Sequence, residues 1–201
     1  MIGFKRGDTM VEVLLGITVF SIILLGAQNA MNNSLSTTKS SLESTQVRSM
    51  IDSQASLLRF LQNSYIFAKS VGTSVFQPGT PAQSWNILKA YVSGSSSIMN
   101  FGVGSITCPD VPSAAFLINP KDATIFKKTD DTTNTRFMKA SSGISTINYN
   151  DDLSINKASG IWIEGLDIGN NQIDFYIRAC WYTAGIKNPN TLATIVRLNN
   201  V

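Results

Sequence analysis

The residues with the most distinctive chemistry in this sequence are one acidic side chain and two cysteines. Glu12 is the only charged residue between Asp8 and Lys39, and the apolar run from Val13 to Ala27 follows it directly. A carboxylate at membrane depth costs about 2.5–3.5 kcal/mol on insertion scales, so an acid in such a segment indicates a function that needs a partner. Cys108 and Cys180 could form a disulfide in an oxidising compartment, and two unpaired thiols are the alternative.

The composition excludes several kinds of catalytic or metal site. The 201 residues include no histidine, so Ser-His-Asp and Cys-His nucleophile systems and His-ligated metal sites are impossible. Two cysteines cannot build a zinc site with four cysteine ligands or an iron–sulfur cluster. With 43% hydrophobic and 14% charged residues, the chain is too apolar for a disordered protein. We therefore expect no enzyme, no cofactor and no metal, and a β-rich domain that meets water through hydroxyls and amides.

The N-terminal segment predicts a membrane span at about residues 10–31. Lys5 and Arg6 precede it and no charge closely follows it, which places the N-terminus on the cytoplasmic side. A secretory signal peptide is the alternative, but it needs small residues at positions −1 and −3 of its cleavage site. Leu25 would stand at −3 for a cut after Ala27, and Gln28 for a cut after Ala30. Neither residue fits that requirement.

The segment GDTMVEVLLGITVF, from Gly7 to Phe20, resembles the cleavage site and apolar stem of type IV pilins and pseudopilins. The resemblance implies that residues 1–7 are a leader, which prepilin peptidase removes by cutting between Gly7 and Asp8. Glu12 then occupies the fifth mature position, where the family has a glutamate that neutralises the new α-amine of a neighbouring subunit, and Thr9 caps or lines that contact. The first mature residue is usually a methylated Phe; here it is Asp8, so methylation stays open.

The sequence predicts an α+β fold. A long helical stem is expected over residues 8–70, because no proline occurs before Pro78 and apolar residues beyond the anchor recur at steps of three, four and seven. Residues 71–201 are expected to form a β-rich head in which an antiparallel sheet packs on the stem. A short helix is expected at Ala82–Val92. The expected strands are Ile98–Thr107, Ala114–Ile118, Ala123–Phe126, Gly160–Leu166, Gln172–Tyr182 and Leu192–Leu198, of which the last three form a meander.

Three further patterns are interpreted as ordinary surface or backbone features. The alternating polar residues from Asn148 to Asn156 superficially resemble a calcium loop but lack its glycine and its final glutamate, so a solvated turn is favoured. Gly102-Val103-Gly104 lacks the third glycine of a nucleotide-binding loop. A cationic cluster could serve nucleic-acid capture, but nearby aspartates dilute it and a generic surface is favoured. Its members are Lys127, Lys128, Arg136 and Lys139.

The resemblance implies a structural subunit, with minor favoured over major, of a type IV pilus. Its partners would be other subunits of the helical filament, prepilin peptidase, the assembly machinery of the inner membrane and, before assembly, membrane lipid. The precursor would span the cytoplasmic membrane once and the mature protein would enter an extracellular filament. Motility, adhesion, DNA uptake and secretion all stay open as its task. A pseudopilin of a type II secretion or competence system and an uncleaved membrane-anchored surface-binding protein are the alternatives.

Overall fold

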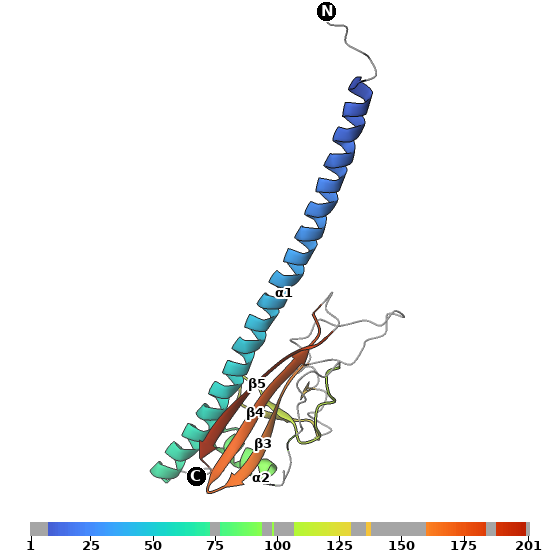
Figure 1. Ribbon diagram of the computed structural model, residues 1–201. Coiled ribbons are helices and arrows are strands. Elements are labelled where there is room, and N and C mark those ends of the chain that lie inside the picture. Colours follow the sequence, from blue (N-terminus) through green and yellow to red (C-terminus); the bar gives the residue numbers. More distant parts are fainter. Residues whose placement is uncertain are drawn as a thin grey trace, which may run out of the picture. The chain divides into compact units, whose positions relative to one another are not determined.

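The computed structural model describes residues 8–72, 77–93, 98, 107–129, 136–137, 160–183 and 188–199. The fold is α+β, as the sequence predicts (Figure 1). Two helices precede a five-stranded antiparallel sheet. In chain order the elements are α1 (Asp8–Val71), α2 (Pro81–Val92), β1 (Phe116–Ile118), β2 (Ile125–Lys127), β3 (Ile161–Gly169), β4 (Gln172–Trp181) and β5 (Asn190–Asn199).

Helix α1 is continuous over 64 residues and ends one residue beyond the predicted stem. Its second half has one apolar stripe, because the spacing of the apolar residues matches the helical repeat. Val47, Ile51, Leu58 and Leu61 lie on this stripe, and each is at most 3% exposed. The chain divides into two compact units between Leu42 and Glu43, so the second half of α1 belongs to the unit that contains the sheet.

The sheet has the strand order β2-β1-β3-β4-β5, with every neighbouring pair antiparallel. The predicted C-terminal meander is confirmed as β3, β4 and β5. Strand β3 ends three residues later than expected, because the turn to β4 uses only Asn170 and Asn171, with φ of 51° and 56°. Asparagine tolerates this left-handed region, and two such residues form the tight turn that matches the twist of a hairpin.

Strands β1 and β2 are shorter than the sequence predicts. Ala114 and Ala115 precede β1, and β2 begins at Ile125 rather than at Ala123. Ala123 has a φ of 56°, and its N–H donates to the carbonyl of Asn119 at 2.9 Å. This residue therefore belongs to the turn between the strands and cannot extend either of them. The predicted strand at Ile98–Thr107 lies almost entirely outside the described residues.

The core packs one face of the sheet against the two helices and continues on the other face, where Leu117, Trp162 and Cys180 are buried as well. Thr80 caps α2, and its hydroxyl accepts a hydrogen bond from the N–H of Gln83 at 3.3 Å. The buried face of α2 presents Trp85, whose ring centroid lies 5.9 Å from that of Phe175 on β4. Gly165 on β3 lets α2 approach closely, since a Cβ there would lie 2.4 Å from Cγ2 of Val92.

Candidate functional site

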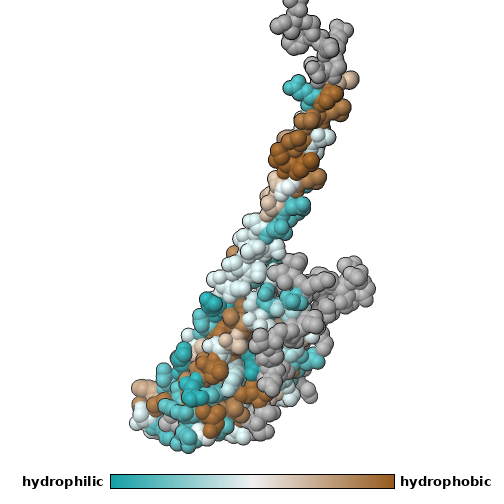
Figure 2. All heavy atoms as spheres, in the orientation of Figure 1, coloured by the Kyte–Doolittle hydropathy of each residue, from teal (hydrophilic) through white to brown (hydrophobic). Residues whose placement is uncertain are grey.

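The segment of α1 from Met10 to Ala27 is predominantly apolar and is exposed along its length. It contains an 18-residue window with a mean hydropathy of 2.3, none of it buried. Figure 2 shows brown apolar residues gathered along this part of the helix. The large apolar side chains from Met10 to Leu25 are each 47–75% exposed. A helix of this length and composition could cross a membrane, because its backbone groups are satisfied internally and its side chains match hydrocarbon.

The hydroxyl groups of this segment are satisfied inside the helix. Thr18 donates to the carbonyl of Leu15 at 2.9 Å, and Ser21 donates to the carbonyl of Ile17 at 2.7 Å. Such local hydrogen bonds let serine and threonine enter an apolar environment at little cost. The carboxylate of Glu12 is the one charged group among the described side chains of this segment. It has neither a hydrogen bond nor an ion pair to another described residue.

Glu12 lies in the second turn of α1 with its side chain exposed. Among the described residues it has no cationic partner. Asp8 and Thr9 form the start of the helix, and their side chains lie outside the described part of the structure, as do residues 1–7, which include Gly7. The structure thus places the predicted assembly residue on an uncovered apolar helix, and the predicted cleavage point lies at the boundary of the described chain.

Cys108 and Cys180 form a disulfide, with their Cα atoms 5.7 Å apart. Cys180 lies on β4, on the face of the sheet opposite to Phe175, and it is 1% exposed. The hydroxyl of Tyr182 accepts a hydrogen bond from the N–H of Cys108 at 3.1 Å. Together these contacts attach the segment before β1 to the last residues of β4.

Three polar residues of α1 hold the helix to the sheet, and sequence reasoning did not identify them. Glu43 accepts a hydrogen bond from the hydroxyl of Thr183, which also accepts one from the side chain of Asn190 at 2.8 Å. Gln62 donates to the carbonyl of Asn199 at 2.7 Å. These contacts tie both ends of β5 to α1.

The third residue, Gln54, substitutes for a neighbouring strand. Its amide accepts from the N–H of Ile118 at 3.0 Å and donates to the carbonyl of the same residue at 2.9 Å. Strand β1 is paired with β3 only at Phe116 and Ile163, so Ile118 has no partner there in the described ladder. The sequence signal for both glutamines was a polar residue adjoining the apolar stripe of the predicted stem.

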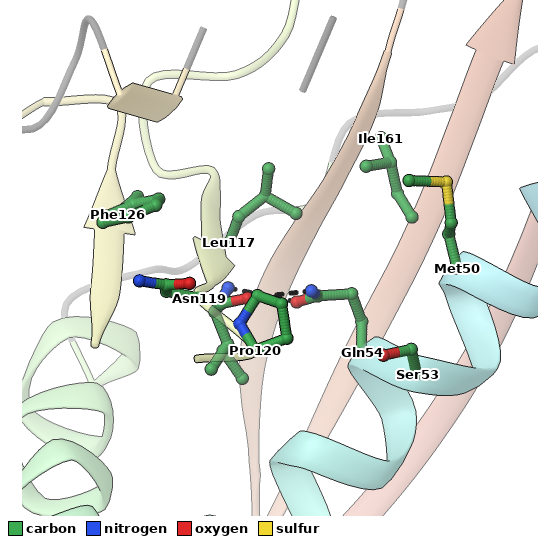
Figure 3. A pocket seen from close by; sticks show the side chains of 9 residues that line it. Met50, Ser53, Gln54, Leu117, Asn119, Pro120, Phe126 and Ile161 are labelled. Atoms are coloured by element: carbon green, nitrogen blue, oxygen red, sulfur yellow. Dashed lines mark hydrogen bonds between the residues drawn. The ribbon is translucent and has the colours of Figure 1, made fainter. Parts of the chain in front are cut away.

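A groove of about 190 Å³ lies beside Gln54, between α1 and the β1–β2 hairpin (Figure 3). Met50, Leu117, Phe126 and Ile161 contribute apolar walls, and no charged side chain of the described residues lines it. The amide of Gln54 is already engaged by Ile118. The groove therefore offers mainly apolar surface, and its remaining polar lining comes from the exposed Ser53 and the half-buried Asn119.

Of the four cationic residues for which an ordinary surface was favoured, the structure describes Lys127, Lys128 and Arg136. Lys127 lies 4.9 Å from the centroid of the Tyr91 ring, and the ammonium of Lys128 donates to the carbonyl of Val111. Arg136 is exposed, and Lys139 lies outside the described residues. The calcium-like segment 148–156 and Gly102–Gly104 also lie outside them. Within the described chain no three His, Cys, Asp or Glu side chains gather as a metal site would require.

The described chain thus defines an α+β protein with one helix able to span a membrane and a disulfide-linked sheet domain. Comparison of the chain with family models, with curated proteins and with solved structures finds no match.

Proposed function

We propose that this protein is a type IV pilin-like subunit, with a minor subunit favoured, that is inserted in the cytoplasmic membrane as a precursor and assembled into an extracellular filament. The observation that carries the proposal is Glu12, a lone carboxylate on an otherwise apolar and uncovered helix, five positions after a glycine that follows two basic residues. The long N-terminal helix followed in the chain by an antiparallel sheet supports it, because the sequence resemblance implies these elements in this order.

The mechanism is electrostatic. Cleavage after Gly7 creates a positively charged α-amine on Asp8, and Glu12 of an adjacent subunit neutralises it. In a medium of low dielectric constant two paired charges are far less costly than two separate ones. The Glu12 carboxylate is costly in the membrane when a subunit is alone. In the filament it stabilises the subunit at the height along the axis where it meets the α-amine of its neighbour.

The uninterrupted helix α1 is compatible with the alternative function, a pseudopilin. The helix runs from Asp8 to Val71 without a break or a proline. Many pilins carry a proline soon after the apolar segment, and a straight stem is more typical of pseudopilins. The two assignments share cleavage and the role of Glu12, and they differ in the partner machinery.

The test is to express the full chain with an active prepilin peptidase and to determine its N-terminus by mass spectrometry. We expect the mature chain to begin at Asp8, and a Gly7→Val variant to keep all seven leader residues. We expect Glu12→Ala to be processed as well as the natural chain but to be depleted from purified filaments, because an uncompensated amine would be left in apolar surroundings. Val13→Ala is the matched control and should enter filaments. A chain that begins at Met1 in the presence of the peptidase would refute the proposal.

A further inference from the structure

Strand β5 is a sheet edge whose outward backbone groups can be identified from the register. The N–H of Cys180 donates to the carbonyl of Gly160 at 3.0 Å, so Cys180 directs its backbone groups to β3. Successive residues of a strand face opposite neighbours, so Ala179 faces β5, where its partner is Leu192. Leu192 and the β5 residues at two-residue intervals from it direct their backbone groups to β4. The residues between them direct N–H and C=O away from the sheet; they are Thr191, Ala193, Ile195, Arg197 and Asn199.

One of these outward groups is already bound by an amide, which supports the assignment. The carbonyl of Asn199 accepts the hydrogen bond from Gln62. The side chains of Thr191, Ala193, Ile195 and Arg197 are all exposed, and Ile195 is 57% exposed. In the described part of the chain no strand pairs with this side of β5. A ten-residue edge without a bulge in its ladder presents donors and acceptors that an extended backbone can satisfy.

Two exposed arginines of α1, Arg48 and Arg59, lie on the same side of the helix as Gln62, whose amide contacts this edge at Asn199. Contacts of Glu43 and Gln62 place α1 along the length of β5 (Figure 1). Around the helix, Arg48 and Arg59 are about 40° and 60° further from the centre of the buried stripe than Gln62, on the same side. Both are exposed, and neither forms an ion pair among the described residues. They are 11 residues apart, about 16 Å along the axis.

We infer that the outer edge of β5 binds an extended acidic peptide segment of a partner protein as a sixth strand. Backbone hydrogen bonds to Ala193 and Ile195 hold the segment, and its acidic side chains face Arg48 and Arg59. Side chains on one face of a strand recur every two residues, about 6.8 Å apart, so two acids four residues apart span about 14 Å and match the two guanidinium groups within their reach. The alternate side chains of the segment lie beside Ile195 and are apolar.

The experiment uses the full chain, with its disulfide intact, in a zwitterionic detergent. The probe is the fluorescent peptide Thr-Glu-Val-Gln-Val-Glu-Val-Thr, titrated by anisotropy, and the control peptide has glutamine in place of both glutamates. Amide hydrogen exchange locates the peptide, because the N–H groups of Ala193 and Ile195 gain protection only if a strand pairs with them. We expect saturable binding, protection at these two amides, and affinity about tenfold weaker for the control peptide or in high salt.

Two sets of variants separate the backbone and charge contributions. N-methylation of alternate peptide residues on one edge should weaken binding by about tenfold or more, whereas N-methylation on the other edge should leave it intact. Arg48→Gln with Arg59→Gln should reduce the affinity of the acidic peptide about fivefold and leave that of the control peptide unchanged. Lys39→Gln with Lys121→Gln is the matched control for net charge, and it should change neither affinity.

Three results would overturn the inference. The first is the absence of saturable binding by a chain whose β4 amides are protected as in the folded protein. The second is binding without protection of Ala193 and Ile195, because the peptide would then lie elsewhere. The third is equal tolerance of N-methylation on both edges, because a paired strand has only one edge toward β5.

Discussion

At the scale of single residues, the close approach of Val92 to Gly165 restricts the side chain that position 165 can carry. A Cβ at position 165 would lie 2.4 Å from one methyl carbon of Val92 and 2.9 Å from the other. We expect Gly165→Ala to destabilise the protein by about 1–3 kcal/mol, because inserted carbon atoms displace packed neighbours. The measurement is the free energy of unfolding by urea denaturation.

The control for this substitution is the same change in a Val92→Ala background. Removing both methyl groups of Val92 removes the main collision, so Gly165→Ala should then cost less than half as much. An equal cost in both backgrounds would show that the collision with Val92 is not the cause. Gly72, whose φ is 68° and whose Cβ would meet no atom within 4 Å, supplies a comparison in which only backbone strain acts.

Asp174 on β4 is held ionised by a bidentate pair with Arg197. The guanidinium donates to its two oxygens at 2.7 and 2.8 Å. These hydrogen bonds hold the pKa of Asp174 below its ordinary value, although burial opposes the shift. Because the folded protein then binds fewer protons than the unfolded chain, this contribution to stability is present above about pH 4 and is lost as the pH falls through the lowered pKa.

We expect Asp174→Asn to lower the stability at pH 7 and to flatten its decline toward acid pH. Urea denaturation at intervals from about pH 2 to pH 7 measures both effects. Asp52→Asn serves as the reference, since Asp52 is exposed on α1 and has no salt bridge among the described residues. Parallel stability curves for the natural chain and Asp174→Asn would contradict the assignment.

At the scale of elements, Gln54 connects α1 to strand β1. Replacing it with alanine would leave the N–H and C=O of Ile118 without this partner, and a buried unsatisfied polar group costs about 1–3 kcal/mol. We therefore expect Gln54→Ala to be destabilising by that amount and to accelerate amide exchange at Ile118. Gln46→Ala, an exposed position on the same helix, should change neither quantity. Unchanged exchange at Ile118 would mean that the amide is not supporting β1.

The sequence predicted those elements whose signals are local. The helical spacing of α1 and the two-residue alternation of β4 were sufficient for both elements, and their bounds agree within one residue. Strand β2 was predicted to begin too early, because Ala123 belongs to the turn that follows Asn119 and its left-handed backbone conformation is not signalled by its residue type. The contact of Gln54 with Ile118 joins residues distant in the chain, so no local pattern predicts it. The pairing of β1 with β3 is equally non-local, and no pattern in either segment specifies it.

The candidate site divides in the same way. Glu12 was identified from the sequence alone, because a charged residue beside an apolar run is evident without a structure. The sequence shows that Cys108 and Cys180 are the two cysteines, but it leaves open whether they are bonded. The disulfide forms because the fold brings Cys108 next to Cys180 on β4. In the sequence, Arg48 and Arg59 are ordinary polar residues of the predicted stem. Only the structure, in which β5 lies beside α1, shows that both are on the side of the helix that contacts β5 through Gln62.

At the scale of the whole molecule, the apolar core and the apolar N-terminal segment belong to different compact units. Within the described chain the core begins at Val47, and the units divide between Leu42 and Glu43. Folding of the sheet domain should therefore depend on the part of α1 that supplies Val47, Ile51, Leu58 and Leu61. It should not depend on the segment suited to a membrane.

We accordingly expect a chain that begins at Glu43 to fold without detergent and to unfold in one cooperative transition, with a stability within about 1 kcal/mol of the full chain. The carboxylate of Glu43 offsets the new α-amine at this helix N-terminus, where the helix dipole disfavours a positive charge. A chain that begins at Ala55 is the matched comparison, and it should be unfolded because it lacks Val47, Ile51 and Gln54. Circular dichroism with urea titration distinguishes the two. If both chains folded equally well, α1 would not be part of the domain's core.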